Sequence, residues 1–118
     1  MTREEIIAKW DGQTPREHDA WVAEVVFGWK PLGDGRMRSS DGFMIRAIPE
    51  YTSDISEAWT VVDASKTDFL VRRRTCGLGY RAWVSLSRYD AEAGVSVNRP
   101  IAPEAICLAA ITASLQSD

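Results

Sequence analysis

Apolar residues in the first 28 positions follow the spacing of two helices. Thr2 begins the first segment and Thr14 the second, each with a glutamate three residues later in a capping-box arrangement. Pro15 suits the first position of the second helix, and Gly28 is the residue type that ends one. The second segment has its apolar residues on one face: Trp21, Val22, Val25 and Val26. We therefore expect an N-terminal extension helix within residues 1–13, followed by an amphipathic helix.

A third helix is predicted in the segment YTSDISEAWTVVD, residues 51–63. Its start is polar, so Thr52 or Ser53 can serve as the N-cap, and Asp54 suits the positive end of the helix dipole. Apolar residues then recur at i, i+3, i+4 and i+7, as Ile55, Ala58, Trp59 and Val62. We expect a helix over about 53–64 whose apolar stripe faces the core.

After residue 67, the spacing of apolar residues changes from that of a helix to every second position, as in a β-strand. The segments DFLVRRRTC and YRAWVSLSRY surround GLG, which predicts a β-hairpin. Both faces of these strands carry apolar residues, so we expect a sheet that is covered on both sides. VSVN can add a short strand after the DAEAG loop. Earlier in the chain, PLGDGRMRSSDGF is typical of loop and turn, and FMIRAIPE of a short extended piece.

The last segment, APEAICLAAITASLQ, has the composition of a buried helix. Pro103 lies in its first turn, and most of its surface is apolar, which favours packing against a sheet. The element order predicts one α+β domain over residues 1–118. We expect a small three-layer α/β/α sandwich with a central, mainly antiparallel sheet.

Composition narrows the classes of function. The net charge is −3 and the pI is about 5.2, which argues against a general nucleic-acid-binding surface. Cys76 and Cys107, with His18 as the single histidine, cannot form a zinc set, so we expect two buried free thiols. No window approaches the roughly 20 apolar residues that span a bilayer, and the first residues do not resemble a signal peptide. We expect a protein of a reducing cytoplasm without a membrane partner.

Three segments resemble one known family in the family's order. VAEVVFGWK, YTSDISEAWTVVD and IAPEAICLAAITA are similar to parts of the phage ABA (α/β/α) sandwich domain. The stretch before Thr14 and the run Arg72–Arg74 depart from the family pattern. The resemblance implies a phage or prophage gene product with this fold and no particular enzymatic activity. By analogy with small phage proteins that sequester bacterial immune signals, it suggests a nucleotide-type ligand that is held without being cleaved.

Arginines of the hairpin are the first candidates for ligand binding. Strand alternation places Arg72 and Arg74 on one face and Arg73 on the other, and Arg81 and Arg88 of the next strand can join them. Guanidinium groups match phosphate oxygens, so these residues can form an anion site. Alternatively, they are the solvated charges of an edge strand.

The start of the third helix and one tryptophan are further candidates. Tyr51, Ser53 and Asp54 lie where free backbone N–H groups can bind an anion, although capping alone explains these residue types. Trp29 follows a helix-ending glycine and can stack on a base, or else cover the core. Three other tryptophans at amphipathic positions, Trp21, Trp59 and Trp83, are expected in the core.

Evidence for catalysis is weak. The sequence has none of the common hydrolase, nucleotide-binding or metalloprotease motifs, and His18 is expected to face solvent. We therefore expect a binding protein without a catalytic residue, cofactor or metal. Two alternatives stay open: a protein interaction module that acts on a host or phage protein or forms a homo-oligomer, and a nucleotide hydrolase that uses Asp54 and Glu57.

Overall fold

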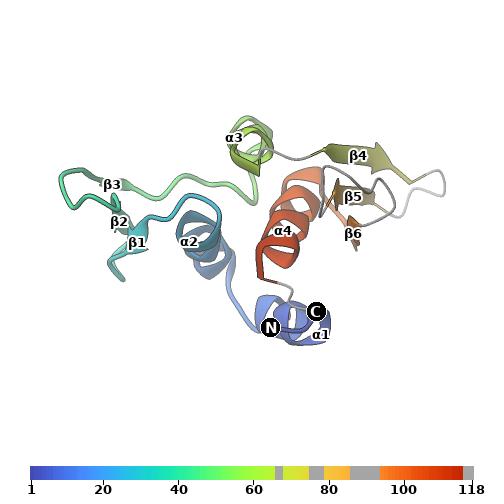
Figure 1. Cartoon of the computed structure of the whole chain (residues 1–118), viewed down its shortest axis with the longest axis horizontal. Coiled ribbons are helices and arrows are strands. Elements are labelled where there is room, and N and C mark those ends of the chain that lie inside the picture. Colours follow the sequence, from blue (N-terminus) through green and yellow to red (C-terminus); the bar gives the residue numbers. More distant parts are fainter. Residues whose placement is uncertain (66–67, 75–78, 86–93, 116–118) are drawn as a thin grey trace.

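The computed structural model describes residues 1–65, 68–74, 79–85 and 94–115 (Figure 1). Its helices are α1 (Arg3–Asp11), α2 (Pro15–Val25), α3 (Ile55–Ser65) and α4 (Ala102–Leu115). Its strands are β1 (Lys30–Pro31), β2 (Arg36–Arg38), β3 (Ile45–Ala47), β4 (Phe69–Arg73), β5 (Tyr80–Ser85) and β6 (Gly94–Arg99). The predicted α+β sandwich is confirmed. No described helix has the length and hydrophobicity needed to cross a membrane.

Capping boxes start α1 and α2, as the sequence predicts. The hydroxyls of Thr2 and Thr14 accept hydrogen bonds from the N–H groups of Glu5 and Glu17, and both glutamates accept one in return. These bonds lower the pKa of both carboxyl groups. Both helix starts are therefore determined by short-range contacts within four residues.

Helix α4 lies at the centre of the molecule. Figure 1 shows the β4–β5–β6 sheet on one side of it and α2 and α3 on the other, with α1 near its lower end. Residues 105–112 are all buried, including Ile106, Leu108 and Ile111 at 0% exposure. The several alanines of α4 have short side chains, which let these neighbours approach closely.

The larger sheet is antiparallel in the order β4-β5-β6. Its inner face is apolar and packs on α4, with Ala82, Val84, Val95 and Val97 nearly inaccessible. On its outer face Leu70 is 55% exposed, and Arg72 and Arg81 are exposed. These three residues are therefore exposed on a face that was expected to be covered.

A second antiparallel sheet, β1-β2-β3, follows α2. Strand β3 lies in the predicted extended piece, whereas β2 lies in the segment that was predicted to be loop and turn. Gly33, Gly35 and Gly42 have positive φ angles of 84°, 86° and 82°, which permit the tight turns between its short strands. Figure 1 shows this sheet at the end of the molecule opposite β4.

Helix α3 begins two residues later than predicted, and a different residue caps it. The Oδ1 atom of Asp54 accepts the Ser56 N–H at 2.8 Å, which makes Asp54 the N-cap. Thr52 is buried, and it donates from both its N–H and its hydroxyl to Oδ1 of Asp19, at 2.9 and 2.8 Å. Thr52 therefore joins α3 to α2 instead of capping a helix.

The apolar stripe expected to face the core is rotated around α3. Ala58 and Val61 are at 0% exposure, whereas Ile55 and Trp59 are 44% and 50% exposed. The small Ala58 allows α3 to lie close to α4, and this packing turns the larger Trp59 outward. The assignment of Trp59 to the core is therefore wrong.

His18 is buried, which corrects its expected exposure. Its ring stacks on Trp10 with centroids 3.8 Å apart, and its Nε2 lies 2.6 Å from the Trp10 carbonyl oxygen. Cys107 is also buried, as predicted, and burial raises the pKa of its thiol. Cys76 lies outside the described residues.

Candidate functional site

The outer face of β4–β5–β6 brings two of the predicted arginines together. Arg72 of β4 is the register partner of Arg81 of β5, which is in turn the partner of Asn98 of β6. The next rung on the same face consists of Leu70, Trp83 and Ser96. We call the surface formed by these two rungs the arginine face.

Charge on the arginine face is uncompensated within the described part of the chain. Like charges directly opposite each other in a sheet repel, so the Arg72–Arg81 pair does not stabilise the strand pairing. The ion pairs in this part of the chain join Arg36 to Asp34, and Arg99 to Asp11 and Glu104. Neither arginine of the face belongs to them, so both guanidinium groups can meet an external anion.

Asn98 holds one of these guanidinium groups in place. The Nε atom of Arg81 donates to Oδ1 of Asn98 at 3.0 Å. This bond restricts the side chain and leaves its terminal nitrogens for another acceptor. Asn98 therefore orients Arg81 on the arginine face.

Arg74 continues the ladder just beyond β4, since its N–H donates to the Gly79 carbonyl oxygen at 2.9 Å. Strand alternation puts its side chain on the side of Arg72, and it is half-buried. Arg88, the remaining candidate of this group, lies outside the described residues.

The other predicted binding residues lie away from the arginine face. Figure 1 shows the start of α3 and the end of α2 on the other side of α4 from the sheet. Ser53 and Asp54 are exposed, but the Ser56 N–H is already bonded to Asp54, which removes one amide from any anion site. Trp29 is half-buried against the core, the arrangement expected of a cover over it.

Tyr51 is part of the core. It is 4% exposed, its ring stacks on Phe27 with centroids 5.1 Å apart, and burial raises its pKa to about 12. Its carbonyl oxygen accepts a hydrogen bond from the Cys107 thiol at 3.3 Å. These contacts give Tyr51 a structural role beside α4.

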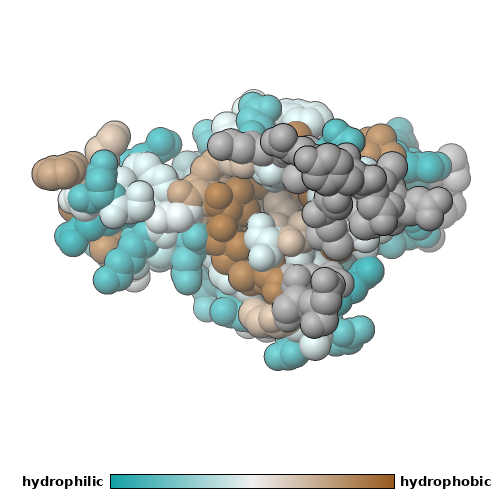
Figure 2. Space-filling view, viewed as in Figure 1, coloured by the Kyte–Doolittle hydropathy of each residue, from teal (hydrophilic) through white to brown (hydrophobic). Residues whose placement is uncertain are grey.

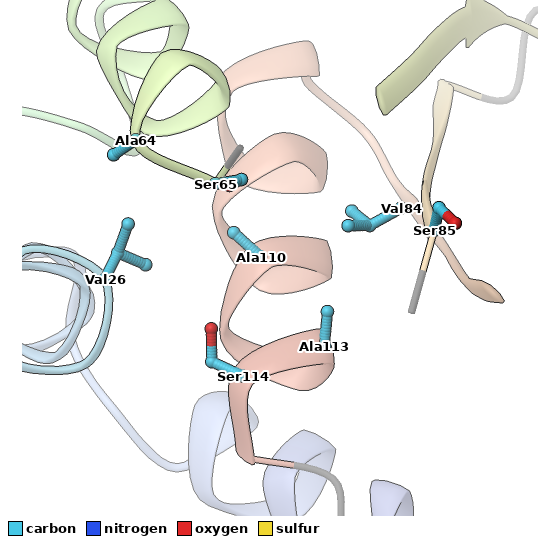
Figure 3. A pocket seen from close by; sticks show the side chains of 8 residues that line it. All are labelled: Val26, Ala64, Ser65, Val84, Ser85, Ala110, Ala113 and Ser114. Carbon is cyan, nitrogen blue, oxygen red and sulfur yellow. The ribbon is translucent and has the colours of Figure 1, made fainter. Parts of the chain in front are cut away.

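A cavity of about 210 Å³ lies where several elements end (Figure 3). It is lined by Val26, Ala64, Ser65, Val84, Ser85, Ala110, Ala113 and Ser114. Figure 2 shows apolar residues gathered near the middle of the molecule in this view. None of the lining residues is titratable, so this cavity suits a small uncharged group better than acid–base chemistry.

A cleft of about 140 Å³ lies between α2 and the smaller sheet. Arg16, Asp19, Gly35, Ile48 and Glu50 line it. Burial raises the pKa of Asp19, and the two hydrogen bonds from Thr52 oppose this shift. Sequence reasoning missed Asp19 because its partner Thr52 is 33 residues away. In the ranges that the structure describes, no three acidic, histidine or cysteine side chains are placed to share a metal ion.

Comparisons with known proteins agree with this architecture. A family model described as the phage ABA sandwich domain matches residues 20–111. A crystal structure of a phage protein from Bacillus cereus ATCC 14579 superposes with a TM-score of 0.73 at 23% sequence identity. The match covers 91% of this chain and 94% of the other, and at this identity it shows a shared fold alone. No curated protein matches the chain.

Proposed function

The chain belongs to the phage ABA sandwich domain family, and from this premise we propose that it binds a small anionic ligand on its arginine face. One observation carries the proposal: Arg72 and Arg81 lie directly opposite each other on an exposed sheet face, without a carboxylate partner in the described residues. An anion that bridges the two guanidinium groups would offset the repulsion between them and form charge-assisted hydrogen bonds with both.

The chemistry of the face favours phosphate. Guanidinium groups bind phosphate oxygens through paired hydrogen bonds, and the bond to Asn98 fixes the orientation of Arg81 before a ligand arrives. Three strands separated by about 4.8 Å provide a platform roughly 10 Å wide. This width suits a small molecule, and the net charge of −3 disfavours a long nucleic acid.

A nucleotide-type immune signal of the bacterial host is the ligand class that we propose. The protein would then be a non-catalytic accessory protein of a phage, which acts by holding the signal. The two rungs of the face carry arginine, asparagine, leucine, tryptophan and serine, and none of these is a general base. We therefore expect bound ligand to stay intact.

Binding can be tested by calorimetry with a panel of cyclic nucleotides and ADP-ribose derivatives. At least one member should bind, and Arg72→Ala and Arg81→Ala should each weaken it at least about 10-fold. Arg38→Ala is the matched control, since Arg38 is an exposed strand arginine on the other sheet. The absence of binding across the panel, or equal losses in all three variants, would overturn the proposal. Mass analysis after long incubation separates holding from hydrolysis, because the hydrolase alternative requires products.

Protein interaction is a second candidate, and the tip of the β2–β3 hairpin supports it. Phe43 is 90% exposed, with Met44 at 59% and Ile45 at 50% beside it. Exposed apolar clusters of this kind commonly mark contact surfaces. A Phe43→Ser variant should abolish any concentration-dependent association seen by sedimentation. A strictly monomeric wild type at high concentration would argue against self-association.

A further inference from the structure

The indole ring of Trp83 lies over the backbone of a neighbouring strand. A Cβ atom placed on Gly94 would be 2.2 Å from Nε1 and 2.4 Å from Cε2 of Trp83. Those distances are far below van der Waals contact, so the ring occupies the space of the missing side chain. Gly94 begins β6, one rung diagonally from Trp83, since Trp83 pairs with Ser96 and Gly94 with Ser85.

This arrangement corrects the expectation that Trp83 belongs to the core. Trp83 shares the outer face with Arg81 by strand alternation, and it is half-buried. The ring contacts the backbone at Gly94, and the residue keeps part of its surface exposed. Leu70, the register partner of Trp83 on β4, is 55% exposed on the same face. Trp83 therefore adds an aromatic ring to the arginine face.

The aromatic ring and the cations lie on one face of the sheet, at different rungs. The rungs of Arg81 and Trp83 are about 7 Å apart along the strand, and the ring reaches on over Gly94, which is one rung further from Arg81. Arg72 lies opposite Arg81, so both arginines belong to one rung on the same side of Trp83. A nucleoside phosphate can span this separation, because its sugar and phosphate and the arginine side chains all add to the reach between a base on Trp83 and the two guanidinium groups.

We infer that Trp83 stacks on the base of a nucleotide whose phosphate is bound by Arg72 and Arg81. This inference rests on the proposed function and specifies the ligand further: it requires a base as well as an anion. Gly94 is a positioning residue in this arrangement, since any larger side chain would displace the ring. If Trp83 had a purely structural role, the ligand would not need to contain a base.

Two probes that differ only by the base test the inference. Adenosine 5′-monophosphate and ribose 5-phosphate carry the same phosphate and sugar, and calorimetry gives the affinity of each. Stacking of a base on an aromatic ring should make wild type bind the nucleotide roughly 10-fold or more tightly than the sugar phosphate. Trp83→Ala should remove this preference while ribose 5-phosphate binds as before. Trp59→Ala, which removes an exposed tryptophan on α3, should retain this preference.

A second variant moves the ring without deleting it. Gly94→Val should displace Trp83 and reduce the preference for the nucleotide to within about twofold of that of Trp83→Ala. Circular dichroism and thermal unfolding identify variants that have lost the fold. Trp83→Phe keeps an aromatic ring, so it should retain part of the preference for the nucleotide that Trp83→Ala loses.

The outcomes separate the two proposals. Equal affinity of wild type for the two probes overturns the stacking inference and leaves the anion site intact. Loss of the preference in Trp59→Ala to the same degree as in Trp83→Ala also overturns it. If neither probe nor any member of the nucleotide panel binds, the proposed function itself fails.

Discussion

The stacked pair of Trp10 and His18 joins α1 to α2 through a buried contact. Gln13 N–H also donates to the Trp10 carbonyl oxygen, at 3.1 Å, so this oxygen keeps a partner if the histidine is removed. We expect His18→Ala to reduce the free energy of unfolding by about 2 kcal/mol, from lost stacking and one hydrogen bond. Chemical denaturation measures this change. His18→Phe should recover part of it, because phenylalanine stacks but does not donate; equal losses in both variants would contradict this division.

Asp19 makes stability depend on pH. Its pKa is raised in the folded protein, so the folded state binds this proton more tightly than the unfolded state does. Stability from this residue is therefore greatest below the unfolded pKa and falls as pH rises through the folded value. Asp19→Asn keeps an oxygen acceptor for Thr52 and removes the titration.

The free energy of unfolding of Asp19→Asn should therefore increase relative to that of wild type as pH rises from about 4 to 7. Urea unfolding across this range, compared between the two proteins, tests the expectation. Asp19→Ala, which also loses the acceptor for both Thr52 bonds, should be less stable than Asp19→Asn at every pH. A constant difference between wild type and Asp19→Asn would show that Asp19 does not titrate differently on folding.

At the scale of elements, α3 depends on a cap that is one or two residues later than the sequence suggested. Asp54→Ala should destabilise the protein by about 1 kcal/mol, because it removes the acceptor of the Ser56 N–H. Ser53→Ala is the matched control and should change stability by less than about 0.5 kcal/mol, since Ser53 is exposed. Thermal unfolding of the two variants decides between the positions, and a larger loss in Ser53→Ala would contradict the assignment.

Short-range signals were predictable, and long-range packing was not. The capping boxes of α1 and α2 need only residues three apart, so the sequence reveals them directly. The periodicity of α3 fits two helix faces that differ by a small rotation, and only contact with α4 selects the one bearing Val61. Strand alternation placed Arg72 near Arg81, because register follows from the hairpin. The position of Trp83 depends on Gly94, which lies on a third strand, and no local pattern reports that contact.

At the scale of the molecule, α1 is part of the core although the family match begins at residue 20. Ile6 and Trp10 are 0% and 1% exposed, and Nε1 of Trp10 donates to Oε1 of Glu104 in α4 at 3.1 Å. We expect Trp10→Ala to cost about 3–5 kcal/mol. Trp59→Ala, on an exposed helix face, should cost less than about 1 kcal/mol. Equilibrium unfolding of both variants gives the comparison, and similar losses would mean that α1 packs only loosely.

The central position of α4 has a consequence for synthesis on the ribosome. Residues 102–115 are translated after every other described element, yet α1, α2, α3 and the larger sheet all pack on them. A nascent chain that ends before Ala102 has no partner for the apolar faces of those elements, so its folding waits for the last helix to leave the exit tunnel. Until then those faces are open to chaperones, and a truncated product would be a ready target for proteolysis.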